Sequence, residues 1–324
     1  MAPSSSVAPL RPAPKRLPRA ARAAVLRWFD ERGRALAFRA TRDPYAILVS
    51  EVMAQQTQIS RVVQAWPAFL ERFPTVEALA AATPADVVRA WRGMGYDRRA
   101  LNLRRAARTI VDEHGAVVPS DVAALERLPG IGPYTARAVA AIAFESGLGA
   151  VDTNVRRVLG RTLAGATGPS MPAPWLQAAA DLAVDRDRPG DWTHAVMDVG
   201  ATICRPANPH CGECPLLSWC RFAKDAIDAP SIAVGGDRAA ASRPAPRPPP
   251  ARVPATRFAA TTRWLRGRIV DRLRAVDGVG WTTVAGPIGD HNAAAVRAAL
   301  VALAGDGVIE LHHDEPARAR LAIG

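Results

Sequence analysis

Lysine is nearly absent from this 324-residue chain: of its 42 basic side chains, only Lys15 and Lys224 are lysines. Long hydrophobic runs are absent too, and without an apolar stretch of about 18 residues the sequence predicts no membrane-spanning helix. The first residues are basic and rich in proline and serine but lack the apolar segment of a secretory signal. Together these absences predict a cytoplasmic protein with no membrane partner.

Alternation of apolar and polar residues, which marks half-buried strands, is scarce before residue 225. Apolar residues recur there at helical spacing, and pairs such as Thr83-Pro84 suit a helix cap followed by a first turn. The sequence therefore predicts an all-α fold for this part of the chain. The expected helices span residues 20–32, 45–53, 59–73, 75–82, 84–91, 98–113, 174–184 and 192–204.

Composition divides the chain into four parts. Residues 1–18 are predicted to form a disordered basic leader, 19–225 a helical domain, 226–256 a semi-extended Pro/Ala/Arg linker, and 257–324 a small winged-helix-like unit. The elements expected in the last part are helices at 264–276 and 292–305, a middle segment near 284–290 that completes a three-helix bundle, and short strands at 308–312 and 318–323.

Charge is strongly unbalanced. The formal net charge is +12, and its basic component is almost entirely arginine. Arginine binds phosphate through two parallel hydrogen bonds, so this balance favours a polyanionic partner such as nucleic acid. The alternative is an arginine-rich composition that serves no partner.

The stretch Leu128–Ala136 (LPGIGPYTA) predicts a tight turn between two helices, the second beginning at Pro133. Gly130 and Gly132 leave backbone N–H groups exposed, and amides at a helix N-terminus form a phosphate site. The pattern fits a DNA-binding helix-hairpin-helix or an ordinary turn between helices. The second helix is expected to run to Gly147 and Gly149 and to be followed by Asp152, which is either a helix cap or a catalytic carboxylate.

All four cysteines lie in one 17-residue segment, spaced C-x6-C-x2-C-x5-C: Cys204, Cys211, Cys214 and Cys220. In an intracellular chain this clustering predicts metal binding instead of disulfides. Structural zinc sites usually show paired short knuckles, and here there is one short pair. A [4Fe–4S] cluster and a zinc ion both remain open on spacing alone.

Four segments resemble the helix-hairpin-helix base-excision DNA glycosylases: SEVMAQQT (50–57), LPGIGPYTA, VDTN (151–154) and the cysteine pattern. SEVMAQQT narrows the resemblance, which covers residues 26–224, to the adenine DNA glycosylase (MutY) family. The resemblance implies a two-lobed helical domain with a [4Fe–4S] cluster loop at 204–220. It also implies double-stranded DNA as partner and excision of adenine mispaired with 8-oxoguanine or guanine.

The same resemblance implies catalytic roles. Glu51 is expected to protonate N7 of adenine, and Asp152 to stabilise or capture the sugar cation, as two carboxyl groups do in glycosidases. Asn154 is expected to hold that geometry. Tyr134 occupies the position of the lysine with which endonuclease III-like relatives cut the strand, so the chain is predicted to be monofunctional, with Tyr134 tuning Asp152.

Because such enzymes flip the target base out of the duplex, something must fill the gap. The resemblance assigns DNA contacts to Gln55, Gln56, Thr57, Tyr96, Gly130, Gly132, Phe38 and Arg39. Among these, Gln55 and Tyr96 are expected to wedge beside the opposing purine, unless Tyr96 is simply a core aromatic. Arg98, Arg99, Arg104 and Arg105 are expected either to contact phosphates or to form a solvated helix face.

Two departures from the family pattern qualify these expectations. Phe38 stands where members of the family usually carry tryptophan. Many members also end in a Nudix-like domain that inspects 8-oxoguanine, and the tail of this chain is too short and too helical for that domain. Alternative functions are a thymine (T·G) mismatch or endonuclease III-like glycosylase on the same fold, or a non-catalytic DNA-binding iron–sulfur protein. The expected state is a monomer associated with the nucleoid.

Overall fold

The structure is a computed structural model that describes residues 13–165, 170–228, 257–276 and 280–324. The chain forms two compact units, each made of two separate stretches. Unit 1 comprises Met1–Ala35 and Ala140–Pro244, and unit 2 comprises Leu36–Val139 and Ala245–Gly324. Residues 1–12 of the expected leader and 229–256 of the expected linker lie outside the described residues.

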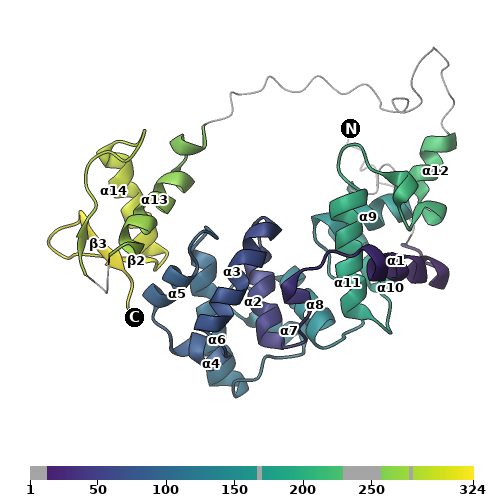
Figure 1. Ribbon diagram of the computed structural model, residues 1–324, viewed down its shortest axis with the longest axis horizontal. Helices are drawn as coiled ribbons and strands as arrows, with labels where there is room; N and C mark the ends of the chain where they lie inside the picture. The colour runs from purple at the N-terminus through teal and green to yellow at the C-terminus, as the bar shows by residue number, and fades with distance from the viewer. Residues whose placement is uncertain (1–12, 166–169, 229–256, 277–279) are drawn as a thin grey trace, which may run out of the picture. The chain divides into compact units, whose positions relative to one another are not determined.

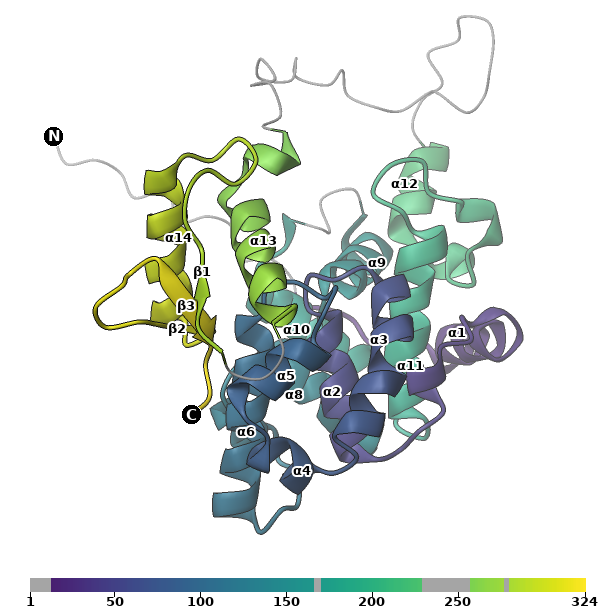
Figure 2. The same cartoon turned by 60° about the vertical axis from the view of Figure 1, so that its left-hand side comes forward.

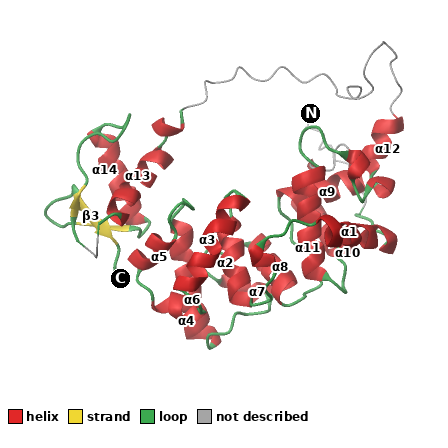
Figure 3. Ribbon diagram, in the orientation of Figure 1, coloured by secondary structure: helices red, strands yellow, loops and turns green. Residues whose placement is uncertain are grey.

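Unit 1 is helical in its described residues (Figures 1 and 3). Its elements are α1 (Arg19–Arg32), α9 (Thr153–Ala164), α10 (Ala173–Ala183), α11 (Pro189–Asp198), the π-helical turn η3 (Val199–Ile203), the short turns η4 (Cys211–Glu213) and η5 (Leu217–Trp219), and α12 (Arg221–Asp228). The helix expected at 192–204 thus begins three residues earlier, at a proline, and changes to a π-helical turn where the prediction continued it as α-helix.

The core of unit 1 lies where α1 packs on α11. Ala21, Val25 and Leu26 are buried on α1. Ala21 and Val25 are four residues apart, which places them on the same helix face. Trp192 and Val196 share the cluster from α11. Leu17, which precedes α1, is also buried in it.

The first part of unit 2 is a helical array. Its elements are η1 (Ala37–Arg39), α2 (Pro44–Ala54), α3 (Ile59–Arg72), α4 (Val76–Ala81), α5 (Pro84–Ala90), α6 (Arg98–His114), α7 (Val122–Arg127) and the start of α8 (Pro133–Ala143). These agree with the expected helices to within about two residues. Thr75, Thr83 and Asp121 cap the short helices α4, α5 and α7, each accepting a backbone N–H with its side-chain oxygen.

The predicted helix–turn–helix around Gly130 is confirmed as α7, a hairpin and α8. The prediction that α8 reaches Gly147 is wrong: α8 ends at Ala143. Glu145 adopts a left-handed backbone conformation (φ 52°), which terminates the helix. A loop therefore separates α8 from Asp152, which is the N-cap of α9.

The C-terminal part of unit 2 combines α13 (Thr262–Arg274) and α14 (Ala293–Gly305) with a small sheet (Figure 2). The strands β1 (Thr282–Thr283), β2 (Ile309–Leu311) and β3 (Arg318–Leu321) pair antiparallel in the order β1-β3-β2, with Thr282 opposite Ala319 and Ile309 opposite Leu321. A short turn, η6 (Phe258–Ala260), precedes α13. The two helices and two of the strands match the prediction.

The prediction of a third helix near residues 284–290 is wrong. This segment continues from β1 into an isolated bridge between Ile288 and His291. Gly286 and Gly289 both have positive φ angles (76° and 59°), and a Cβ on Gly289 would lie 2.6 Å from the Trp264 ring. The glycines therefore serve two turns, which a helix would not contain.

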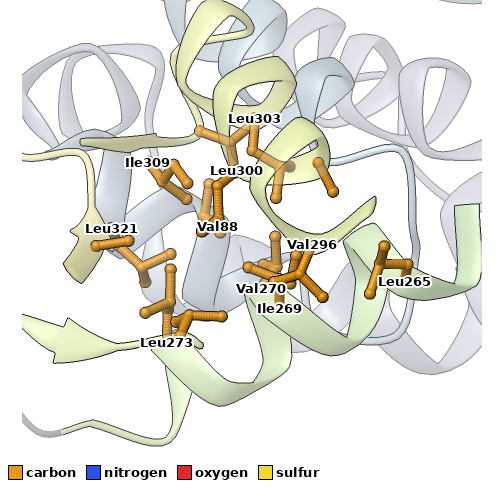
Figure 4. Close-up of a cluster of buried hydrophobic side chains, with 14 of the residues drawn as sticks. Val88, Leu265, Ile269, Val270, Leu273, Val296, Leu300, Leu303, Ile309 and Leu321 are labelled. Atoms are coloured by element: carbon orange, nitrogen blue, oxygen red, sulfur yellow. The ribbon is translucent and has the colours of Figure 1, made fainter. Parts of the chain in front are cut away.

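The hydrophobic core of this part continues into the helical array of unit 2 (Figure 4). Leu265, Ile269 and Leu273 of α13 share one buried cluster with Leu300 of α14 and Val88 of α5. The C-terminal helices and strands and the array are thus parts of a single folded unit. No helix in the described residues is both long and apolar enough to cross a membrane.

Candidate active site

Glu51 lies near the C-terminal end of α2, a helix whose start is fixed by its cap. The Asp43 carboxylate accepts hydrogen bonds from the N–H groups of the next turn (3.0 and 3.3 Å), and Pro44 occupies the first helical position. Every residue at positions 45–53 is buried, and Glu51 itself is only 7% exposed. Burial restricts this carboxyl group to few conformations, as a positioned acid requires.

A tyrosine contacts this carboxyl group. The Tyr134 hydroxyl, from the first turn of α8, donates to Oε2 of Glu51 at 3.1 Å. The phenol O–H is the donor of this hydrogen bond, and the Glu51 carboxyl oxygen accepts it. The sequence assigned the influence of Tyr134 to Asp152, whereas the structure gives its hydroxyl a bond to Glu51.

The turn after α2 is joined to the helix–hairpin–helix. The Gln55 side-chain amide donates to Oγ1 of Thr135 at 3.1 Å and to the backbone oxygen of Gly130 at 3.4 Å. Gln56 is exposed and has a positive φ angle (52°), and Thr57 follows it. The structure therefore brings together two segments that the sequence analysis assigned separately to DNA.

Arg99 stabilises the turn after α2 through hydrogen bonds from its side chain. Its guanidinium donates hydrogen bonds to the backbone oxygens of Val52 (3.0 Å), Met53 (3.0 Å) and Gln55 (2.5 Å). It also donates to the Thr57 hydroxyl and to the backbone oxygens of Met94 and Gly95. Burial lowers the pKa of Arg99 to about 10, so it stays cationic at neutral pH. The suggestion that Arg99 contacts phosphate is wrong, because its donors are directed into the protein.

The other basic residues of α6 differ from Arg99. Arg104 donates to the backbone oxygen of Ala82, so it too is engaged within the protein. Arg105 is exposed and bonds Asn102 within the same helix at 3.1 Å. Arg98 is exposed. Arg98 and Arg105 thus stay candidates for phosphate contacts.

Tyr96 is displayed at the surface. It follows the turn at Gly93 and Gly95, has a positive φ angle of 49°, and is 41% exposed. These observations exclude a core position for its ring. Two guanidiniums lie over the ring: that of Arg263 at 4.2 Å and that of Arg99 at 5.7 Å from the centroid.

The hairpin glycines have different roles. Gly130 has φ 80°, and a Cβ there would lie 2.7 Å from Cβ of Asn102 on α6, so the fold requires glycine. Gly132 has an ordinary φ, is exposed, and would meet nothing within 4 Å. Gly130 therefore shapes the turn, while Gly132 leaves open surface at the N-terminus of α8.

Phe38 and Arg39 lie in η1. The Phe38 ring is 7% exposed and packs edge-on against Trp66, with centroids 6.3 Å apart. Trp66 is held in turn by a 3.0 Å bond from its indole N–H to the Ala46 oxygen. Arg39 is half-buried.

Asp152, in unit 1, caps α9. Its Oδ1 accepts the Val155 N–H at 2.6 Å, and its Oδ2 accepts the side-chain amide of Asn154 at 3.0 Å. Asp152 is therefore a helix cap. This role is compatible with a catalytic one, because the same hydrogen bonds hold its carboxylate in place. The contact of Asn154 with this carboxylate is observed, whereas its catalytic role stays a prediction.

Arg157 continues this chain of contacts toward the cysteines. Its Nη2 donates to Oδ1 of Asn154 and to the Gly200 oxygen, both at 2.7 Å, and its Nε donates to the backbone oxygen of Cys204 at 2.5 Å. A Cβ on Gly200 would lie 2.5 Å from Cβ of Asn154, so glycine permits the close approach of η3 to α9. The sequence analysis missed Arg157; its only signal was the i,i+3 spacing from Asn154.

Arg34 and Asp198 form a second arrangement that the sequence analysis missed. Asp198 is fully buried, and its carboxylate accepts the backbone N–H of Arg34 at 2.9 Å and the Nε at 2.8 Å. These bonds join the end of α1 to the start of η3 across the sequence. No local pattern reveals a partner so distant along the chain.

The four cysteine side chains line one cavity of unit 1, with mostly apolar neighbours such as Val158, Ile203 and Leu217. Burial raises the pKa of Cys214 to about 12, and the pKa of Cys220 and Cys211 is raised for the same reason. Arg161 donates to the sulfur of Cys204 at 3.4 Å. Thiolates in these surroundings need a positive group between them.

The four cysteines line one cavity, although among the described residues no three His, Cys, Asp or Glu side chains lie close enough together to hold a metal ion. The [4Fe–4S] cluster and the zinc ion therefore both stay predictions.

Comparisons with known proteins identify the class to which this chain belongs. Residues 49–171 match the model of the HhH-GPD superfamily base excision DNA repair proteins. A solved structure of a thermostable thymine-DNA glycosylase superposes with a TM-score of 0.58 and 27% identity, covering 63% of this chain and 95% of that one. This segment thus has the sequence and the fold of the helix-hairpin-helix base-excision DNA repair proteins.

Relatives that match over most of their length identify the family within this class. An adenine DNA glycosylase of Mycolicibacterium smegmatis is 42% identical over 252 residues, covering 77% of this chain and 79% of the relative. One of Mycobacterium tuberculosis is 40% identical over 257 residues, covering 78% of each chain. This chain belongs to the adenine DNA glycosylase family.

Proposed function

We propose that this protein is a monofunctional DNA glycosylase that excises adenine mispaired with 8-oxoguanine or guanine in base excision repair. The observation that supports it most directly is the buried Glu51 carboxyl group, held by the Tyr134 hydroxyl on a chain of the adenine DNA glycosylase family. The arginine excess suits DNA as the partner and the nucleoid as the place of action. The monomeric state stays a prediction.

The proposed reaction begins with extrusion of the adenosine nucleotide from the duplex. Glu51 gives a proton to N7 of adenine while the C1′–N9 bond breaks, and the bonding electrons leave with the base. The Asp152 carboxylate, fixed by its cap and by Asn154, stabilises the positive charge that develops on the sugar. Water adds to C1′, and the proton it loses replaces the one that Glu51 gave.

Tyr134 supports the monofunctional assignment, since a phenol at this position cannot form the Schiff base that a lysine amine forms. We expect borohydride treatment during turnover to trap no covalent protein–DNA adduct. Electrophoresis of the treated reaction is the measurement. Efficient trapping would overturn this part of the proposal.

Removing the hydroxyl with Tyr134→Phe should lower adenine release by about tenfold, because a hydrogen bond to a charged group contributes about 1.5–3 kcal/mol. The bond also favours the ionised carboxylate, so its loss should move the pH dependence of single-turnover release to higher pH. Tyr45→Phe is a matched control, since the Tyr45 hydroxyl bonds the Phe73 oxygen at 2.9 Å instead. An unchanged rate and pH profile for Tyr134→Phe would contradict the role given to its hydroxyl.

The four cysteines fit a [4Fe–4S] cluster, with Cys204, Cys211, Cys214 and Cys220 as ligands. When bound, the cluster would cross-link the segment from η3 to α12 and supply positive charge between buried thiolates; no step of the proposed reaction passes through it. Arg161 and Arg157, which bond the sulfur and the backbone of Cys204, would hold the cluster segment against α9.

We expect the purified protein to be brown and to contain four iron atoms and four acid-labile sulfides per chain. Cys214→Ser should lose the colour and lower the midpoint of thermal unfolding, because a buried ligand is lost. Metal analysis and absorption spectroscopy measure both. A colourless wild-type protein with one zinc ion per chain would refute the cluster.

One experiment separates the proposed activity from its alternatives. Duplexes containing A·8-oxoG, A·G, T·G or A·T are incubated with the protein and treated with alkali, which cleaves at abasic sites. We expect cleavage at adenine in the first two duplexes only. Cleavage at T·G would indicate a thymine glycosylase, and binding without cleavage would indicate a non-catalytic iron–sulfur protein.

A further inference from the structure

A large groove lies in unit 2 beside the turn that carries Tyr96. Its volume is about 1210 Å³, and its walls come from Gln55, from the segment around Gly93–Arg99 and from α13. Eight arginines and three aspartates line it, a net charge of +5. A groove with this charge excess attracts a polyanion.

The two walls of the groove are fixed to each other. The Arg274 side chain of α13 is 4% exposed and donates to the Asp97 carboxylate at 2.6 Å and to the Val88 oxygen at 3.0 Å. Asp97 immediately precedes α6 and follows Tyr96. Together with the shared hydrophobic core (Figure 4), this buried pair keeps α13 beside the Tyr96 turn.

Some of the arginines in the groove are available to a ligand. Arg266 is paired with Asp306, and Arg268 with Asp271. Arg92 and Arg263 form no ion pair with any residue that the structure describes, and Arg92 is exposed. Arg263 lies over the exposed Tyr96 ring with its guanidinium 4.2 Å from the centroid.

We propose that this groove binds one strand of the DNA duplex, with Arg92 and Arg263 contacting its phosphates on either side of Tyr96. The C-terminal helices and strands are then part of the DNA-binding surface. This inference rests on the proposed function for the kind of nucleic acid. The exposed part of the Tyr96 ring offers an apolar contact to the sugars and bases of a strand, while the arginines beside it meet the phosphates.

The groove also continues into the turn after α2. Gln55 and Gln56 line it together with Tyr96. An acidic protein segment would use only the charge of the groove. A nucleic-acid strand uses that charge through its phosphates and can also contact the exposed part of the Tyr96 ring through its sugars and bases, so it is the occupant that the observations favour.

The test is the salt dependence of duplex binding by the full-length holoprotein carrying Arg92→Gln and Arg263→Gln together. Each lost phosphate contact lowers the slope of log K against log salt by about 0.9, so the double variant should lose about 1.8. Arg297→Gln is the matched control, since Arg297 is exposed on α14 outside the groove and its loss removes the same kind of charge. The control should keep the wild-type slope.

Binding is measured by fluorescence anisotropy on an undamaged duplex and on one with A·8-oxoG, and thermal unfolding shows that each variant is folded. A folded double variant with the wild-type slope would overturn the proposal and leave the groove to another class of partner. Binding to undamaged DNA needs no base release. If the double variant showed a reduced slope while the wild-type protein released no adenine, the proposed function would be wrong and the groove assignment would still hold.

Discussion

Glu51→Gln should lower the rate of adenine release by about 10³-fold, within the range that general acid catalysis contributes. Glutamine has nearly the shape of glutamic acid and can still accept a hydrogen bond from Tyr134, so the buried position should tolerate it. What the amide lacks is a transferable proton. The measurement is single-turnover release from an A·8-oxoG duplex, followed by alkaline cleavage.

The control for this substitution is Glu126→Gln, since Glu126 is an exposed residue of α7. It removes the same charge from unit 2 without touching the buried carboxyl group, and should leave release unchanged. Duplex affinity of Glu51→Gln should equal that of the wild type, which confines its defect to the chemical step. If Glu51→Gln released adenine at the wild-type rate, Glu51 would not be the acid.

Asp152→Asn should separate catalysis from folding. Asparagine caps a helix about as well as aspartate, so the free energy of unfolding should change by less than about 1 kcal/mol. The negative charge that we propose to stabilise the developing sugar cation is lost, however, and adenine release should fall by about 10²- to 10³-fold. Chemical denaturation measures the first quantity and single-turnover kinetics the second.

Asp121→Asn offers the same substitution in the same structural role. Asp121 caps α7 by accepting the Ala124 N–H at 2.8 Å and is exposed. We expect a similar small change in stability and no change in release. A large loss of stability in Asp152→Asn with unchanged kinetics would reduce Asp152 to a cap.

Local chemistry explains why much of the fold was predictable. Helix starts follow from single residues, such as Asp43 before Pro44 or Thr83 before Pro84, whose side chains accept the first free N–H groups. The end of α8 was not predictable, because it depends on Glu145 in a left-handed conformation that sequence rules assign to glycine. The prediction accordingly extended the helix to the next glycine.

The contacts of the candidate site could not be predicted from the sequence. The resemblance to known glycosylases proposes Glu51, Tyr134 and Asp152 as site residues, but only the structure shows that the Tyr134 hydroxyl bonds Glu51. Arg99 was misjudged because a basic helix face looks the same in sequence whether its side chains point to solvent or to backbone oxygens. Such hydrogen bonds to the protein interior depend on tertiary packing, which the spacing of residues in the sequence does not reveal.

The division of unit 1 between two distant stretches has a consequence for biosynthesis. Helix α1 ends at Arg32, whereas α11, on which it packs, begins at Pro189. At roughly 5–20 residues per second the ribosome needs on the order of ten seconds to deliver that partner. During this interval the apolar stripe around Val25 has no native docking surface, so nascent chains should be most vulnerable to aggregation before the second half of unit 1 has emerged.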